Sequence, residues 1–124
     1  MTSHTNIPVK WMAVESLMSG FFHGPSDVWS FGVTLWEMFT FGESPYLEGC
    51  EDYFRAEQSE EKLKEQMNSW IQKLNEGFRF LKPEACPARL YSDVMLRCWI
   101  NNFNLRPDFV LLQRLLKQIE KEVT

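Results

Sequence analysis

The sequence lacks an excess of positive charge. Thirteen Lys and Arg residues face 17 Asp and Glu residues, so that the 124-residue chain has a formal net charge of −4. Nucleic acids and anionic membrane surfaces are bound through clustered positive charge. The composition therefore predicts no nucleic acid among the partners of this chain.

Long apolar runs are also missing. No stretch approaches the roughly 18 consecutive apolar residues of a transmembrane helix. The first residues, MTSHTNIPVK, lack the apolar core of a signal peptide. We therefore expect no membrane segment in this chain and a cytoplasmic location.

Cysteine is scarce and irregularly spaced. The three residues, Cys50, Cys86 and Cys98, fit neither a disulfide framework nor a CxxC metal site. We interpret them as reduced thiols. Neither His4 nor His23 has a further ligand residue at metal-binding spacing, so that no metal site is predicted.

Apolar and aromatic residues are plentiful, at 44% and 15%, which suffices for one domain with a single core. The segment SDVWSFGVTLWEMF, residues 26–39, is apolar in almost every direction, and this predicts a buried helix. Only Ser30, Thr34 and Glu37 interrupt it, and we call these three residues the polar stripe.

Local signals predict where this helix begins and ends. Ser26 and Asp27 follow the turn-forming pair Gly24-Pro25 and are suitable N-caps, and Gly42 lies just beyond the last apolar residue. We therefore expect the helix to start at Ser26.

Three further segments predict helices. SEEKLKEQMNSWIQKLNEG has one apolar face and a possible N-cap at Ser59, which is typical of a half-buried surface helix. PARLYSDVMLRCW, from Pro87, and the segment from about Pro107 predict two more. No segment has the alternation of a strand, so that the predicted fold class is all-α.

Four motifs occur in a fixed order along the chain. They are IPVKWMAVESL (7–17), SDVWSFGVTLWEMFTFGESPY (26–46), CW (98–99) and RPDF (106–109). Their order and spacing resemble the C-terminal half of the large lobe of a protein-tyrosine kinase. The resemblance implies that residues 1–124 are part of a kinase domain, from the substrate-positioning loop to the last helix. The chain would then be the helical C-lobe portion of the α+β protein kinase fold.

The middle of the chain is less similar to the family. Residues 47–81 are longer than in most tyrosine kinases and imply an enlarged insertion. A helical insertion here resembles Janus-type cytosolic kinases. The segment CWINNFNLRPDF, with Phe103 at a common proline position, is similar to the Syk-type group. Both branches remain open.

The resemblance implies a substrate platform at Pro8, Val9, Lys10 and Trp11. In tyrosine kinases the proline packs against the phenol ring of the substrate, and the lysine and tryptophan shape the surface for the flanking peptide. Correct positioning supplies much of the catalysis of phosphoryl transfer. We therefore expect a tyrosine-containing protein as substrate, with ordinary loop packing as the alternative role of this motif.

Three further residues have structural roles by the same resemblance. Glu15 and Arg106 match the family's buried ion pair, which ties the substrate loop to the helical core. Asp27 matches the aspartate that accepts hydrogen bonds from the catalytic loop, and helix capping is its alternative role. Val14 stands where the family has a proline.

ATP and Mg²⁺ are the ligands that the resemblance implies for the intact kinase. The sequence has no glycine-rich loop, no strand lysine, no catalytic Asp with its Asn, and no Asp-Phe-Gly. We therefore predict no catalytic residue in this chain, no ATP or metal bound by it alone, and no activity without the remainder of the kinase domain.

Two hypotheses of function follow. In the first, the chain is part of a protein-tyrosine kinase that transfers the ATP γ-phosphate to tyrosine in signalling, and it supplies substrate positioning and the lobe core. In the second, it is a non-catalytic, kinase-derived helical module that binds partners through residues 7–17 and 63–74. Exposed apolar surface on the chain, or self-association of the chain, would favour the first hypothesis, because a part of a larger domain exposes the surface on which the rest of that domain packs.

Overall fold

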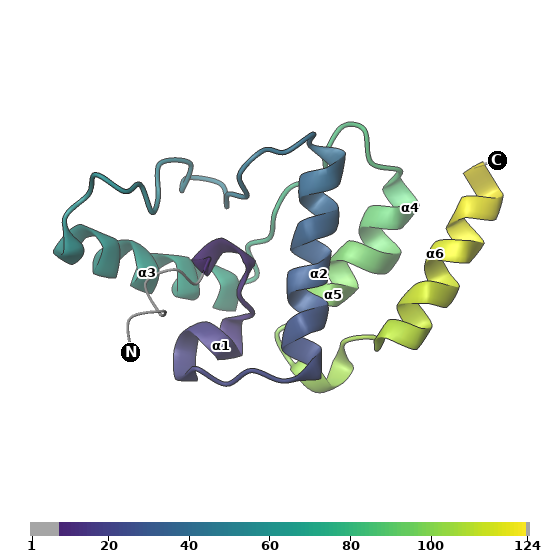
Figure 1. The fold of residues 1–124 in the computed structure, drawn as a ribbon, viewed down its shortest axis with the longest axis horizontal. Coiled ribbons are helices and arrows are strands. Elements are labelled where there is room, and N and C mark those ends of the chain that lie inside the picture. Colours follow the sequence, from purple (N-terminus) through teal and green to yellow (C-terminus); the bar gives the residue numbers. More distant parts are fainter. Residues whose placement is uncertain (1–7, 124) are drawn as a thin grey trace.

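The computed structural model describes residues 8–123 and is built from helices and turns (Figure 1). In chain order the elements are η2 (Val9–Trp11), α1 (Val14–Ser19), α2 (Gly24–Phe39), α3 (Glu60–Asn75), α4 (Ala88–Leu90), η3 (Tyr91–Met95), α5 (Leu96–Cys98), η4 (Phe103–Leu105) and α6 (Phe109–Val123). No strand occurs among the described residues, and the all-α prediction is confirmed.

Helix α2 lies at the centre of the molecule, with α3 on one side and the α4–α5 run on the other (Figure 1). Val28, Trp29, Val33 and Trp36 are each at most 3% exposed, as expected for a helix that is apolar on nearly every side. The prediction of a buried helix in this segment is confirmed.

The predicted start of α2 is wrong by two residues. The helix begins at Gly24, with His23 in the N-cap position and Pro25 in the first turn. Because proline has a helical φ and needs no N–H partner there, Pro25 extends the helix rather than preceding it. Ser26 is thus the third helical residue, and its hydroxyl lies 3.4 Å from the backbone N–H of His23.

Helix α3 has the predicted cap and the predicted apolar face. The Ser59 hydroxyl accepts a hydrogen bond from the backbone N–H of Lys62, and Gly77, with φ 101°, follows the last turn. Trp70 and Leu74 are fully buried. Met67 and Leu63, about one and two turns before Trp70, stay partly exposed, so the helix is half-buried as expected.

The remaining helices differ in detail from the prediction. The helix predicted from Pro87 is a continuous run from Ala88 to Cys98, but its middle, η3, is wound as a π-helix. Helix α6 begins at Phe109 because Asp108 caps it: Asp108 Oδ1 accepts a hydrogen bond from the Leu111 N–H. The two-turn helix α1 was not predicted, since six residues are too few to show a helical period.

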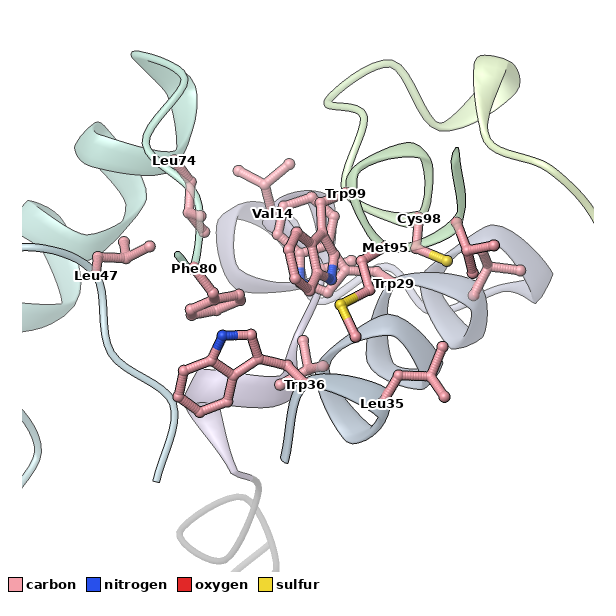
Figure 2. Close-up of a cluster of buried hydrophobic side chains, with 14 of the residues drawn as sticks. Val14, Trp29, Leu35, Trp36, Leu47, Leu74, Phe80, Met95, Cys98 and Trp99 are labelled. Carbon is pink, nitrogen blue, oxygen red and sulfur yellow. The ribbon is translucent and has the colours of Figure 1, made fainter. Parts of the chain in front are cut away.

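Aromatic rings from separate parts of the chain meet in the core, and Figure 2 shows those of Trp36, Phe80 and Trp99. The ring of Phe80 lies 6.1 Å from Trp36, 6.0 Å from Trp70 and 5.1 Å from Trp99, measured between centroids. Phe80 comes from the irregular segment between α3 and α4, so that this loop closes the core. All three cysteines are free and buried.

Candidate functional site

The platform residues form a tight turn. Val9–Trp11 is a single 3-10 turn, in which the Trp11 N–H donates to the Pro8 carbonyl at 3.1 Å and the Met12 N–H donates to the Val9 carbonyl at 3.1 Å. Pro8 is exposed, while Val9, Lys10 and Trp11 are half-buried. Ile7, at the start of the predicted motif, and His4 lie outside the described residues.

The polar stripe of α2 holds this turn. Ser30 Oγ donates a hydrogen bond to the Trp11 carbonyl at 2.7 Å, and the indole Nε1 of Trp11 donates to Glu37 Oε1 at 2.6 Å. The third member, Thr34, donates to the Ser30 carbonyl of its own helix at 3.1 Å. Ser30 and Glu37 were not predicted as site residues. The stripe itself was the signal, because polar groups on a buried helix require partners.

Lys10 extends from the turn toward the segment after α2. Its Nζ donates to Ser44 Oγ at 2.8 Å. Partial burial, together with the nearby guanidinium of Arg55, lowers the pKa of Lys10. No carboxylate in the described part of the chain forms an ion pair with it.

A cavity of about 570 Å³ separates the platform from α3. One wall is formed by residues 8–11, and the other by Phe54, Arg55, Leu63 and Met67. We call this cavity the platform pocket. It is large enough for one or two amino-acid side chains of a bound peptide.

The structure brings Glu15 and Arg106 together, although they are 91 residues apart in sequence. Arg106 Nη1 and Nη2 donate to the two carboxylate oxygens of Glu15, each at 2.8 Å. The Arg106 side chain is fully buried and that of Glu15 is 12% exposed. The remaining donors of Arg106 bind the carbonyls of Ile100, Pro25 and Asn101 at 2.7, 2.9 and 3.5 Å.

A hydroxyl and an aromatic ring complete the surroundings of this pair. Ser26 Oγ donates to Glu15 Oε2 at 2.8 Å, and the Arg106 guanidinium lies 5.0 Å from the centre of the Trp29 ring. Burial alone would raise the pKa of Glu15, but the hydrogen bonds from Arg106 and Ser26 outweigh it and lower that pKa. The carboxylate therefore stays ionised and the pair stays charged at neutral pH.

Asp27 lies apart from the other predicted residues. It is exposed in the first turn of α2, and its carboxylate makes no hydrogen bond within the described part of the chain. Its carboxylate does not cap α2, since His23 holds the N-cap position. Its predicted contact with a catalytic loop stays a prediction.

Comparison with known proteins places these features in a family. The sequence model of the family described as "Protein tyrosine and serine/threonine kinase" matches residues 1–116. The chain belongs to this protein kinase family. It is 36% identical over 121 residues to the mast/stem cell growth factor receptor Kit of the dog, Canis lupus familiaris. It is 34% identical over 122 residues to the tyrosine-protein kinase Srms of the mouse, Mus musculus.

These matches cover 98% of this chain in both cases, but only 10% of Kit and 21% of Srms. The chain thus spans a tenth and a fifth of the length of these two relatives. The resemblance to a protein-tyrosine kinase domain, drawn from the motifs alone, is confirmed. The all-helical architecture is that of a kinase C-lobe segment.

Kinases of this family use ATP and Mg²⁺. Among residues 8–123 no group of three His, Cys, Asp or Glu side chains is placed to hold a metal ion. We assign none of the described residues to ATP or Mg²⁺. No helix in the same range is long and apolar enough to cross a membrane.

Proposed function

We propose that this chain supplies substrate positioning and the lobe core of a protein-tyrosine kinase, which transfers the γ-phosphate of ATP to tyrosine in protein substrates. The observation that carries the proposal is the platform turn. It is fixed to α2 through the Trp11 carbonyl and the Trp11 indole, and it faces an open cavity. A rigid surface beside a cavity is suited to hold a peptide in one orientation.

The platform residues have separate roles in this proposal. The exposed ring of Pro8 packs against the phenol of the target tyrosine, while Lys10 and Trp11 support the peptide on either side of it. Val9 forms part of the pocket wall between them. The pair of Glu15 and Arg106 fixes α1, which follows the platform directly, to the first turn of α2.

The remainder of the kinase domain supplies the chemistry in this proposal. Asp27 is exposed and accepts hydrogen bonds from the catalytic loop of that remainder. ATP and Mg²⁺ bind there, and the chain alone is inactive. Large exposed apolar side chains support the proposal that another part of the kinase domain packs against this chain. Among them, Met38, Phe41 and Val110 are 65%, 87% and 63% exposed. Such surface usually packs against another part of a protein.

Steady-state kinetics on the kinase domain that contains this segment tests the proposal. Pro8→Ala removes two ring methylenes from the contact with the substrate, a partial loss of apolar burial that is worth about 0.5–1.5 kcal/mol and predicts a 2- to 12-fold rise in the KM for a tyrosine peptide. The KM for ATP should not change. Lys117→Ala, an exposed change on α6, is the control and should leave both constants unchanged. The proposal fails if no tyrosine is phosphorylated, or if Pro8→Ala leaves the peptide KM at the wild-type value.

A further inference from the structure

A second cavity, of about 710 Å³, lies where α2 ends, and it shares no lining residue with the platform pocket. One wall comes from the last turn of α2 and the residues after it, among them Trp36, Phe41 and Tyr46. The rings of Trp36 and Tyr46 lie 6.1 Å apart, edge to face. The other wall is the segment 81–85, in the loop between α3 and α4 that passes the C-terminal end of α2 (Figure 1). We call this cavity the helix-end pocket.

Hydrogen bonds hold the loop wall of the helix-end pocket in place. The indole Nε1 of Trp36 donates to the Leu81 carbonyl at 2.7 Å and so joins the loop to α2. Lys82 Nζ donates to the carbonyls of Pro83 and Cys86 at 3.0 and 2.7 Å and closes the loop on itself. The pocket is therefore preformed, as ligand sites usually are.

Phe41 lines this pocket in a backbone conformation that phenylalanine rarely adopts. Its φ is 60°, and it follows the C-cap Thr40, at the position where helices most often have glycine. The Gly42 N–H donates to the Glu37 carbonyl at 2.9 Å, which completes the usual hydrogen bonds of such a helix end. A left-handed conformation is costly for a residue with a Cβ, and a ring that is 87% exposed offsets little of that cost by packing. Strained residues of this kind concentrate at ligand-binding and active sites.

The charged groups of the helix-end pocket favour a cation as its ligand. Glu43 and Glu84 line the pocket, and within residues 8–123 neither carboxylate makes an ion pair or a side-chain hydrogen bond. The ammonium of Lys82, the lining residue of opposite charge, already donates to two loop carbonyls. Carboxylates and aromatic faces both attract cations, and here they line the same cavity.

We propose that the helix-end pocket binds an arginine side chain from an exposed segment of a partner protein. The guanidinium pairs with Glu43 and Glu84 and stacks on the ring of Phe41, a combination that suits a planar guanidinium better than the compact ammonium of lysine. A bulky aliphatic residue beside the arginine packs on Leu81, which is 54% exposed. This site goes beyond the proposed function, because none of its residues belongs to the platform.

Three rhodamine-labelled peptides test the proposal on the full kinase. They have the sequence Gly-Ser-X-Leu-Ser-Gly, with arginine, citrulline or glutamate at X, and citrulline has nearly the shape of arginine without its charge. Fluorescence anisotropy should give a Kd for the arginine peptide about fivefold below that for the citrulline peptide, and the glutamate peptide should bind most weakly. Equal Kd values for arginine and citrulline, or tightest binding of glutamate, overturn the proposal. If no peptide binds, the rest of the kinase covers the pocket, and the proposal is equally wrong.

Removal of charge from the pocket identifies the residues responsible. Glu43→Gln combined with Glu84→Gln should reduce the fivefold difference between arginine and citrulline to about one. Glu61→Gln combined with Glu65→Gln removes the same charge from exposed positions of α3 and should leave the difference unchanged. A difference that survives the first pair of substitutions, or that both pairs abolish, overturns the assignment to this pocket.

Phe41→Gly separates binding from stability. Glycine adopts a φ of 60° without strain, so that this variant should have a Tm about 2–4 °C above that of the wild type. The same change removes the ring and should raise the Kd of the arginine peptide about threefold. A lower Tm would show that the Phe41 ring serves the fold, and an unchanged Kd would show that it does not contact the arginine. Either result contradicts the proposal.

Discussion

Arg106→Ala is the substitution with the largest predicted effect on stability. It removes two hydrogen bonds to Glu15 and one each to the carbonyls of Ile100, Pro25 and Asn101. The carboxylate of Glu15, only 12% exposed, is left with the Ser26 hydroxyl and with the His23 ring, whose Nδ1 lies 4.0 Å from Glu15 Oε2. A buried charge that loses its partner retains its desolvation cost, and this cost dominates the effect.

The expected loss is about 3–5 kcal/mol of the free energy of unfolding, the usual cost of breaking a buried ion pair from one side. For a chain of this size each kcal/mol lowers Tm by roughly 3–5 °C, so that Tm should fall by about 10–20 °C. Circular dichroism at 222 nm during heating measures this directly, because the described residues are mostly helical.

Arg89→Ala is the matched control. Arg89 also binds carboxylates, those of Asp93 and Glu122, but its side chain is 41% exposed. Exposed pairs contribute about 0–1 kcal/mol, so that its Tm should fall by no more than about 5 °C. If Arg106→Ala lowers Tm no further than Arg89→Ala does, the argument from burial is wrong.

Acid should weaken the same ion pair. The pKa of Glu15 is lowered in the folded state, so that its contribution is complete above the unfolded-state pKa of about 4.3 and is lost as the pH falls through the folded value. Glu15→Gln has no carboxylate to protonate at this position. The stability difference between wild type and Glu15→Gln should therefore narrow below about pH 4, and a constant difference from pH 7 to pH 3 would contradict the lowered pKa.

Two further predictions concern the contact between α2 and α5. Gly32→Ala would place its Cβ 2.7 Å from Cys98 Cβ and 2.8 Å from Trp99 Nε1, and this overpacking should cost about 1–3 kcal/mol in urea unfolding. In Gly24→Ala the added Cβ meets no atom within 4 Å, so this control should change the free energy of unfolding by less than about 0.5 kcal/mol. Equal losses of stability in the two variants would refute the close approach of Gly32 to Cys98 and Trp99. Burial raises the pKa of the Cys98 thiol to about 12, so that iodoacetamide at pH 8 should modify Cys98 only in the unfolded protein. Mass spectrometry that detects Cys98 alkylation in the folded protein would contradict this prediction.

The periodicity of apolar residues in the sequence was sufficient to predict the long helices. Residues 26–39 and 60–75 each span several turns, so that their buried faces repeat often enough to be recognised. The Ser59 cap was predicted because N-capping depends on residues only a few positions apart. Local patterns of this kind do not depend on the rest of the fold.

Contacts between distant residues could not be predicted in this way. Trp11 binds Ser30 and Glu37, which are 19 and 26 residues away, and no spacing rule links them. Phe80 lies in a segment that has two nearby prolines and no helical period, yet it is at the centre of the core. The pairing of Glu15 with Arg106 was expected only from the resemblance to the kinase family.

The two walls of the platform pocket are held by different parts of the chain. The platform is attached to α2 through Ser30 and Glu37. The opposite wall is attached to α3, where Gln66 binds the Phe54 N–H and Ser69 binds the Tyr53 hydroxyl. The residues that hold this opposite wall all lie within residues 47–81. A substitution that breaks the contact of Gln66 with Phe54 should therefore move the wall on the α3 side, while the platform stays fixed to α2.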